Sequence, residues 1–570
     1  MEKPHSNNLA LALCLALTTA TGTAYAEADL VFLNARAYTL DAEQPWAEAV
    51  AVENDRIVYV GDNAGAIALS GSETKRHDLN GKMLLPGFID AHMHPLLGGA
   101  YAKALSLETS GTVEQWISAV DQYARAHPEK ELLFGYGFKA TTFGVKGPTK
   151  AQLDAIVPNR PVLIMDEGFH GAWANSQALK LLGINKDTPD PVPGFSYYKR
   201  DEHGVPTGYL LEDTANNAME KLEAVSLEVI IDGTAYVIDE LNSYGVTSVF
   251  DAGASSVAEH IGELLNQLEN NGDLSVRIVG SHFAEADDIA GAVEAAVEQG
   301  ERVKGSRYHY RMLKIMLDGT VEGRTAAMFE DYQGEPGNQG ELVFTQAQTD
   351  LMVTESATKN IDVHIHGLGE RAVHVGLNAI EKARKAHPKS ESRYTICHVQ
   401  VITDEDIPRF AELDVMVQST PLWASYDEYG KAFVSDDQFS RFWRFKSLEN
   451  AGARLTWGSD FPASGAGTLG MSPIVQMEMG ITRQEFGQAE APLQPPITER
   501  LDMKAMIRGY TIDAAYQLHM EDDVGSLEVG KKADLIVLDK NLFEVPTYEI
   551  HTVNVNSTFI DGEEVYSAAP

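Results

Sequence analysis

Two histidines separated by one residue, His92 and His94, have the type and spacing that suit metal chemistry. They end the apolar segment LLPGFIDAHMHP, which begins at Leu84. Residues two apart on a strand point to the same side, so both imidazoles can reach one cation. Imidazole suits zinc and its neighbours. The pair alone is weak evidence, because a hydrogen bond also satisfies a buried histidine.

Further polar residues of this kind end or interrupt other apolar segments. They are Lys314 in MLKIMLDG, His364 and His366 in a second His-x-His pair, His398 in TICHVQ and Asp460 in LTWGSD. A lysine within an apolar strand is costly unless it is paired or neutralised. A buried lysine that loses its proton can react with carbon dioxide, and the resulting carbamate is a carboxylate that can bridge two metals. A salt-bridged or snorkelling lysine is the alternative.

The elements that must position these residues alternate between strands and helices. Eight segments between about residues 83 and 460 have strand character, starting at Leu84, Val246, Leu274, Tyr310, Ile361, Tyr394, Val415 and Arg454. Strands that alternate with helical patterns predict parallel βα units, and eight of them predict an α/β protein with a (β/α)8 TIM-like barrel. The polar residues then fall at the ends of strands one, four, five, six and eight, where active sites of this fold form.

The rest of the chain divides around this barrel. We assign residues 86–519 to the barrel, with an inserted lid subdomain at about 100–212 over its C-terminal mouth. Residues 27–85 and 520–570 both alternate between apolar and polar residues, which predicts strands. We expect the two ends to form one small composite β-sandwich.

The first 26 residues have the pattern of a signal peptide. Lys3 is followed by the apolar run Leu9–Leu17 and by Ala24-Tyr25-Ala26, an A-x-A cleavage site. We therefore expect an exported protein, periplasmic or secreted. Removal of the signal peptide takes Cys14 away and leaves Cys397 as the one cysteine of this sequence, so no internal disulfide can form.

The charge excludes several classes of protein. The formal net charge is −38, which disfavours binding to nucleic-acid phosphates and to anionic lipid headgroups. The partner that we expect is a small-molecule substrate. We expect no nucleic-acid partner and no membrane association once the signal peptide is removed. The sequence does not decide whether the chain forms a homo-oligomer.

The motifs together resemble the amidohydrolase superfamily and, within it, amidohydrolase family 3, the YtcJ-like metal-dependent hydrolases. The matching segments are GKMLLPGFIDAHMHP, LFGYGF, FHGAWANS, PTGYLLE, LKIMLDGTVEGRTA, HIHGLGERAV, WGSDFP and GSLEVGKKADLIVLD. They cover nearly the whole chain after residue 26.

The resemblance implies a divalent metal cofactor, zinc first among the candidates, as one or two ions. His92 and His94 would bind the more buried ion, His366 and His398 a second ion, and a carbamylated Lys314 would bridge them. Asp460 would contact the first ion and the reactive water. His364 matches no ligand of the family, and we expect it one layer deeper on the same face of its strand.

Two departures from the family pattern stand beside these ligands. Gly-Asp-Arg-Ala of the family is replaced by Gly369-Glu370-Arg371-Ala372. Because glutamate has a longer side chain than aspartate, the sequence does not determine the distance from Glu370 to its partner. Glu-His is replaced by Cys397-His398. We expect Cys397 to point away from His398, towards the helices, as a packed core thiol.

Such a site predicts hydrolysis of non-peptide C–N bonds: amide, formamide, carbamate or cyclic amide. A metal lowers the pKa of water so that it attacks a carbonyl carbon, and Asp460 carries a proton from the water to the leaving nitrogen. Candidate substrate contacts are His170 and Trp173 in the insertion, Arg324 after the Lys314 strand, and Trp423 after strand seven. His170 and Arg324 can instead fix loop structure through hydrogen bonds, and Trp423 can have an ordinary hydrophobic role.

Three alternatives stay open on the sequence alone. The same site can serve a deaminase or a lactone or ester hydrolase. A binding or regulatory protein can also use this scaffold, since fold does not determine function.

Overall fold

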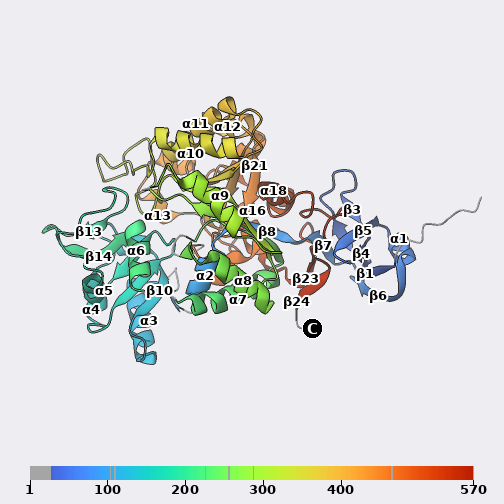
Figure 1. The fold of residues 1–570 in the computed structure, drawn as a ribbon, viewed down its shortest axis with the longest axis horizontal. Helices are drawn as coiled ribbons and strands as arrows, with labels where there is room; N and C mark the ends of the chain where they lie inside the picture. The colour runs from blue at the N-terminus through green and yellow to red at the C-terminus, as the bar shows by residue number, and fades with distance from the viewer. Residues whose placement is uncertain are drawn as a thin grey trace, which may run out of the picture.

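The computed structural model describes residues 27–568 apart from 103, 108–110, 225, 255–256, 287 and 464–465. The predicted signal peptide, residues 1–26, lies outside the described residues. Among the helices of the described part, none has the length and apolarity needed to cross a membrane. Figure 1 shows three parts in a row, with the insertion at one end, the barrel in the middle and the N-terminal strands at the other end.

Eight parallel strands form the central barrel. In chain order and in spatial order they are β8 (Phe88–Met93), β15 (Val246–Asp251), β16 (Arg277–Phe283), β17 (Tyr308–Met316), β18 (Asp362–Gly367), β19 (Tyr394–His398), β20 (Val415–Ser419) and β21 (Arg454–Trp457). After β21, the Asp460 N–H donates a hydrogen bond to the His92 carbonyl at 2.7 Å. The first and last strands therefore meet at the metal-ligand end, and the predicted (β/α)8 architecture is confirmed.

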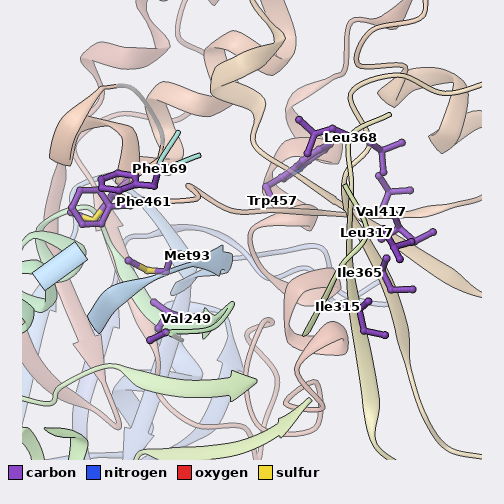
Figure 2. Close-up of a cluster of buried hydrophobic side chains, with 14 of the residues drawn as sticks. Met93, Phe169, Val249, Ile315, Leu317, Ile365, Leu368, Val417, Trp457 and Phe461 are labelled. Atoms are coloured by element: carbon purple, nitrogen blue, oxygen red, sulfur yellow. The ribbon is translucent and has the colours of Figure 1, made fainter. Parts of the chain in front are cut away.

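Side chains along each barrel strand alternate between an apolar layer that packs against the surrounding helices and the interior of the barrel. Figure 2 shows Ile315, Leu317, Ile365 and Val417 gathered on one side of β17, β18 and β20, where they are fully buried. Helix α11 (Glu370–Ala386) contributes apolar residues to the same cluster. The residues between these aliphatic positions point to the opposite face, which is the interior.

The strand predicted from Leu84 is in fact two strands in two sheets. β7 (Met83–Pro86) pairs with β22 (Leu535–Leu538), whereas β8 pairs with β15. Gly87 separates them, and its N–H donates to the Asp534 carbonyl at 2.9 Å. A Cβ at Gly87 would lie 2.3 Å from the Thr247 methyl carbon, so only glycine fits this crossing between sheets.

Two sheets lie beside the barrel and use both ends of the chain. One has the order β5-β4-β1-β6, and the other has the order β24-β23-β22-β7-β2-β3. Their bounds are β1 (Ala28–Leu33), β2 (Arg36–Tyr38), β3 (Trp46–Ala47), β4 (Ala49–Glu53), β5 (Arg56–Gly61), β6 (Ser70–Asp78), β23 (Val555–Ile560) and β24 (Glu563–Ser567). Phe32, Leu84, Leu535 and Phe559 pack together in one apolar core. The C-terminal strands thus share a sheet and a core with N-terminal ones.

The insertion between β8 and β15 has its own sheet and core. Its strand order is β13-β14-β12-β11-β10-β9, with β9 (Leu105–Ser106), β10 (Leu133–Phe138), β11 (Val162–Asp166), β12 (Gly171–Ala174), β13 (Tyr198–Arg200) and β14 (Pro206–Leu211). Helix α3 (Val113–Ala126) buries Trp116 and Val120 in this core. Asn175 is fully buried, and its amide exchanges hydrogen bonds with Val162, Ala178, Val157 and Arg160 backbone groups. This one side chain links β11, β12 and the following helix.

Candidate metal centre

Three of the expected ligands converge at one point inside the barrel. His92 Nε2 and His94 Nε2 lie 3.3 and 3.2 Å from the same oxygen, Oδ1 of Asp460. One ligand atom from each residue lies within 4.8 Å of the others. β8 supplies His92, the residue directly after β8 is His94, and the turn after β21 supplies the carboxylate. Strands one and eight of the barrel therefore build this half of the site together.

The hydrogen bonds of His94 show that the group fits a cation. His94 Nδ1 lies 2.7 Å from the Gly253 carbonyl, which can only accept a hydrogen bond. Nδ1 therefore carries a proton, and in the neutral ring Nε2 presents its lone pair to the Asp460 carboxylate. Two acceptors at 3.2 Å require a cation or a proton between them. Two imidazoles and a carboxylate are a suitable donor set for a divalent metal such as zinc.

His364 lies one layer below His92, on the face that the sequence predicted. Its Nε2 is 2.9 Å from His92 Nδ1, and both rings are fully buried. A proton on His92 Nδ1 that is donated to His364 directs the His92 Nε2 lone pair at the metal position. His364 thus positions a ligand, as partners of metal-binding histidines commonly do.

His366 and His398 supply two further imidazoles next to this group. Their ring centroids are 4.6 Å apart, and His398 lies 4.9 Å from His92. His398 Nδ1 is buried with no hydrogen-bond partner among the described residues, 4.0 Å from Asp460 Oδ2. An orphaned buried nitrogen aimed at the site is what a missing cation leaves behind.

Asp318 is a site residue that the sequence analysis missed. Its carboxylate accepts hydrogen bonds from the Ala327, Leu368 and Gly369 N–H groups, and its Oδ1 lies 3.3 Å from His366 Nδ1. The Leu-Asp-Gly that directly follows the Lys314 strand was the available signal. Asp318 can orient His366 as His364 orients His92.

Lys314 lies directly across from His364 on the neighbouring strand, and Cys397 lies beside it. Lys314 is 3% exposed, and its Nζ donates to Cys397 Sγ at 3.3 Å. The expectation that Cys397 points towards the helices is therefore wrong. His398 and Val399 have φ angles of 73° and 50°, so the strand turns at its end and the alternation of side chains fails there. Both Cys397 and His398 face the interior.

Burial and charge keep the histidines neutral. Burial first and the Lys314 charge next hold the pKa of His92, His364 and His366 well below the ordinary value. Burial and His366 do the same to the pKa of His398. Neutral imidazole is the form that binds metal, so these residues are ready to coordinate at neutral pH. Burial raises the pKa of the Cys397 thiol to about 12.

His170 reaches the site from the insertion. Its ring lies 5.6 Å from that of His366, and its Nδ1 is 2.6 Å from Glu212 Oε2. Burial alone lowers the pKa of His170, but the Glu212 carboxylate outweighs burial and raises it to about 9. Thr325 donates to the other Glu212 oxygen at 2.7 Å. A protonated imidazole thus faces the metal ligands, and Glu212 is a second residue that the sequence analysis missed.

The other candidate contacts differ in their placement. The Trp423 ring lies 5.6 Å from His398 and borders the site. Trp173 is fully buried in the core of the insertion and donates to the Thr149 carbonyl at 2.8 Å, so the prediction that it contacts the substrate is wrong. Arg324 is paired with Glu335 at 2.7 Å, so its charge already has a carboxylate partner.

Glu370, which replaces the aspartate of the family's Gly-Asp-Arg-Ala motif, has defined contacts in the structure. Glu370 is 1% exposed at the start of α11. One oxygen accepts from the Phe329 N–H at 3.3 Å, and the other forms an ion pair with Arg441. The longer side chain therefore binds outside the metal ligand set.

A cluster of neutral imidazoles and a carboxylate at the C-terminal end of a parallel barrel defines a metal-dependent hydrolase. The chain belongs to the amidohydrolase family, whose sequence model matches residues 76–566. It is thus a hydrolase that acts on carbon–nitrogen bonds.

Known proteins resemble the chain over most of its length. It is 31% identical to the exoenzymes regulatory protein AepA of Pectobacterium carotovorum, over 70% of this chain and 87% of that protein. It is 26% identical to the N-substituted formamide deformylase of Arthrobacter pascens, over 94% and 97%. An uncharacterised metal-dependent hydrolase from Pyrococcus horikoshii has the same fold, with 24% identity, a TM-score of 0.70 and coverage of 91% and 99%.

Proposed function

We propose that this enzyme hydrolyses non-peptide C–N bonds of small molecules: amide, formamide, carbamate or cyclic amide. The observation that carries the proposal is the convergence of His92, His94 and Asp460 on one point, with His366, His398 and Lys314 beside them. The formamide deformylase among the relatives supports formamides as the first class to test.

In this proposal His92, His94 and Asp460 hold one divalent cation, and His366 and His398 are placed to hold a second. The cation supplies Lewis acidity, which lowers the pKa of water to about 7. Carbamylated Lys314 is the proposed bridge between two ions. Zinc fits the imidazole-rich donor set, and its identity is part of the proposal.

The chain's own residues carry the proton and the developing charge. Asp460 accepts the proton of the attacking water and gives it to the leaving nitrogen. Burial raises the pKa of Asp460, but the surrounding histidines and the Lys314 charge outweigh burial and keep this pKa below its usual value, so the carboxylate is ionised. His170, held protonated by Glu212, donates a hydrogen bond to the carbonyl oxygen as negative charge develops there.

The test is a screen of N-formyl, N-acyl and carbamate compounds against zinc-loaded protein, with Asp460→Asn as the blank. We expect turnover of at least one class, at least a hundredfold slower in D460N, with metal retained in both proteins by elemental analysis. Near-normal rates in D460N would refute the proton-transfer role. Absence of turnover with every class would favour the regulatory function that the name of AepA suggests.

A further inference from the structure

A separate cluster of charged residues lies where the insertion meets the barrel loops. Lys139 follows β10 and Glu167 follows β11, both in the insertion. Glu322 lies in the loop after β17, and Asp427 lies in the loop after β20. The Lys139 ammonium interacts with all three carboxylates. One positive charge thus faces three acidic groups at the mouth of the barrel.

Glu322 and Glu167 are short of compensating positive charge. Burial first, and then the Asp427 carboxylate, raise the pKa of Glu322 to about 8. Burial raises the pKa of Glu167 to about 7 although Lys139 opposes it. Carboxyl groups that retain protons near neutral pH are poorly compensated, and an additional cation beside them would restore their ionised form.

Gln400 gives an independent indication of a ligand. It is 2% exposed, and its Nε2 donates to Glu322 Oε1 at 2.8 Å. Its Oε1 has no hydrogen-bond partner within the part of the chain that the structure describes. A buried acceptor without a donor costs free energy. An N–H donor placed beside Glu322 would satisfy this oxygen and the carboxylate together.

The cluster lies close to the metal ligands. Gln400 is two residues beyond His398, and two residues span at most about 7 Å of chain. The Gln400 carbonyl accepts from the Trp443 N–H at 2.9 Å. The Trp423 ring lies 5.6 Å from the His398 ring and 6.1 Å from the ring of Trp443, the residue whose N–H bonds to Gln400. Trp443 is buried, whereas Trp423 is partly exposed, so an apolar spacer that runs from the metal centre towards the cluster can pack on the Trp423 ring.

We propose that Glu322, Asp427, Glu167 and Gln400 form a subsite for a cationic nitrogen group, an alkylammonium or guanidinium, at the far end of the substrate. The enzyme then prefers C–N substrates with a positive charge on a short alkyl spacer. This inference rests on the proposed function, and it names the substrate class that the same site selects. Cation–π contact with Trp423 would add to the attraction.

The test compares two formamides that differ in one group. N-formyl-1,4-diaminobutane carries an ammonium where N-formylpentylamine carries a methyl group. We expect kcat/KM to be at least tenfold higher for the ammonium compound in the wild type. In Glu322→Gln we expect this ratio to fall close to one, because the neutral amide keeps the shape and removes the charge. The exposed Glu202 in the insertion provides the control, and E202Q should keep the wild-type ratio.

A binding measurement separates this subsite from the hydrolytic activity. Calorimetry with butylamine, butan-1-ol and Ca²⁺, each alone, requires no turnover. We expect butylamine to bind the wild type and to bind E322Q at least tenfold more weakly, with no binding of butan-1-ol. A ratio that does not change in E322Q, no binding of butylamine, or binding of Ca²⁺ alone would overturn the subsite. If neither formamide is hydrolysed while butylamine binds as expected, formamide hydrolysis fails and the cation subsite stands.

Discussion

Replacing Glu212 by Gln should move the alkaline limit of activity. Glu212 is 3% exposed, and its carboxylate holds the proton on His170 through a hydrogen bond of 2.6 Å. Glutamine keeps the length of the side chain and removes the charge. His170 then loses the main influence that opposes burial. If protonated His170 stabilises the developing oxyanion, activity is present below the pKa of His170 and is lost as pH rises through it.

The magnitude follows from the pKa of His170. Its value in the protein is about 9, and its ordinary value is 6.5. The difference of about 2.5 units corresponds to about 3 kcal/mol. At pH 8 a group with pKa 9 is about nine-tenths protonated, and a group with pKa 6.5 only about 3%. With burial no longer opposed by Glu212, the pKa of His170 should fall to its ordinary value or below, so Glu212→Gln should be slower by at least roughly 30-fold at pH 8, and the difference from the wild type should shrink as pH falls.

The assay is the pH profile of kcat/KM on a formamide that the wild type hydrolyses. Thr325→Val is the matched control, because it removes the hydrogen bond of 2.7 Å to Glu212 and leaves the carboxylate charge in place. Its alkaline limit should stay near 9. An unchanged limit in E212Q, or an equal loss of rate at every pH, would show that the protonation of His170 is not part of the reaction.

Three more changes test the metal centre and the insertion. Lys314→Ala should lose metal and activity, with partial recovery on addition of short carboxylic acids; full metal content by elemental analysis would exclude a bridging role. His364→Ala leaves His92 Nδ1 without its partner at 2.9 Å, so metal affinity should fall about 10- to 100-fold in a competition with a chelator, and unchanged affinity would contradict the positioning role. Asn175→Ala removes four buried hydrogen bonds to the backbone and should lower the free energy of unfolding by about 3 kcal/mol, as measured in urea; a change under about 1 kcal/mol would contradict this reasoning.

The barrel was predictable because its signals are local. Each strand is a short apolar run, and residues two apart such as His92 and His94 share a face wherever the strand is regular. The same rule placed His364 below the ligands, where the structure has it. It failed at Cys397, because the positive φ angles of His398 and Val399 end the regular strand.

The contacts of the insertion were not predictable from spacing. His170 and Glu212 are 42 residues apart, and the hydrogen bond between them depends on how β12 and β14 pair. Trp173, three residues from His170, lies in the core of the insertion. Neighbours in the sequence therefore have opposite environments, and only the register of that sheet decides which side chain reaches the metal ligands.

The crossing at Gly87 has a consequence for the order of assembly. β8 carries His92 and is followed directly by His94. β7 is separated from β8 by Gly87 alone and pairs with β22, more than 440 residues later in the chain. The strand that anchors the first metal ligands therefore leaves the ribosome long after those ligands have been made. We therefore expect metal acquisition to follow the synthesis of β22, so that a nascent chain without β22 binds a divalent metal weakly even when all of its ligands have been made.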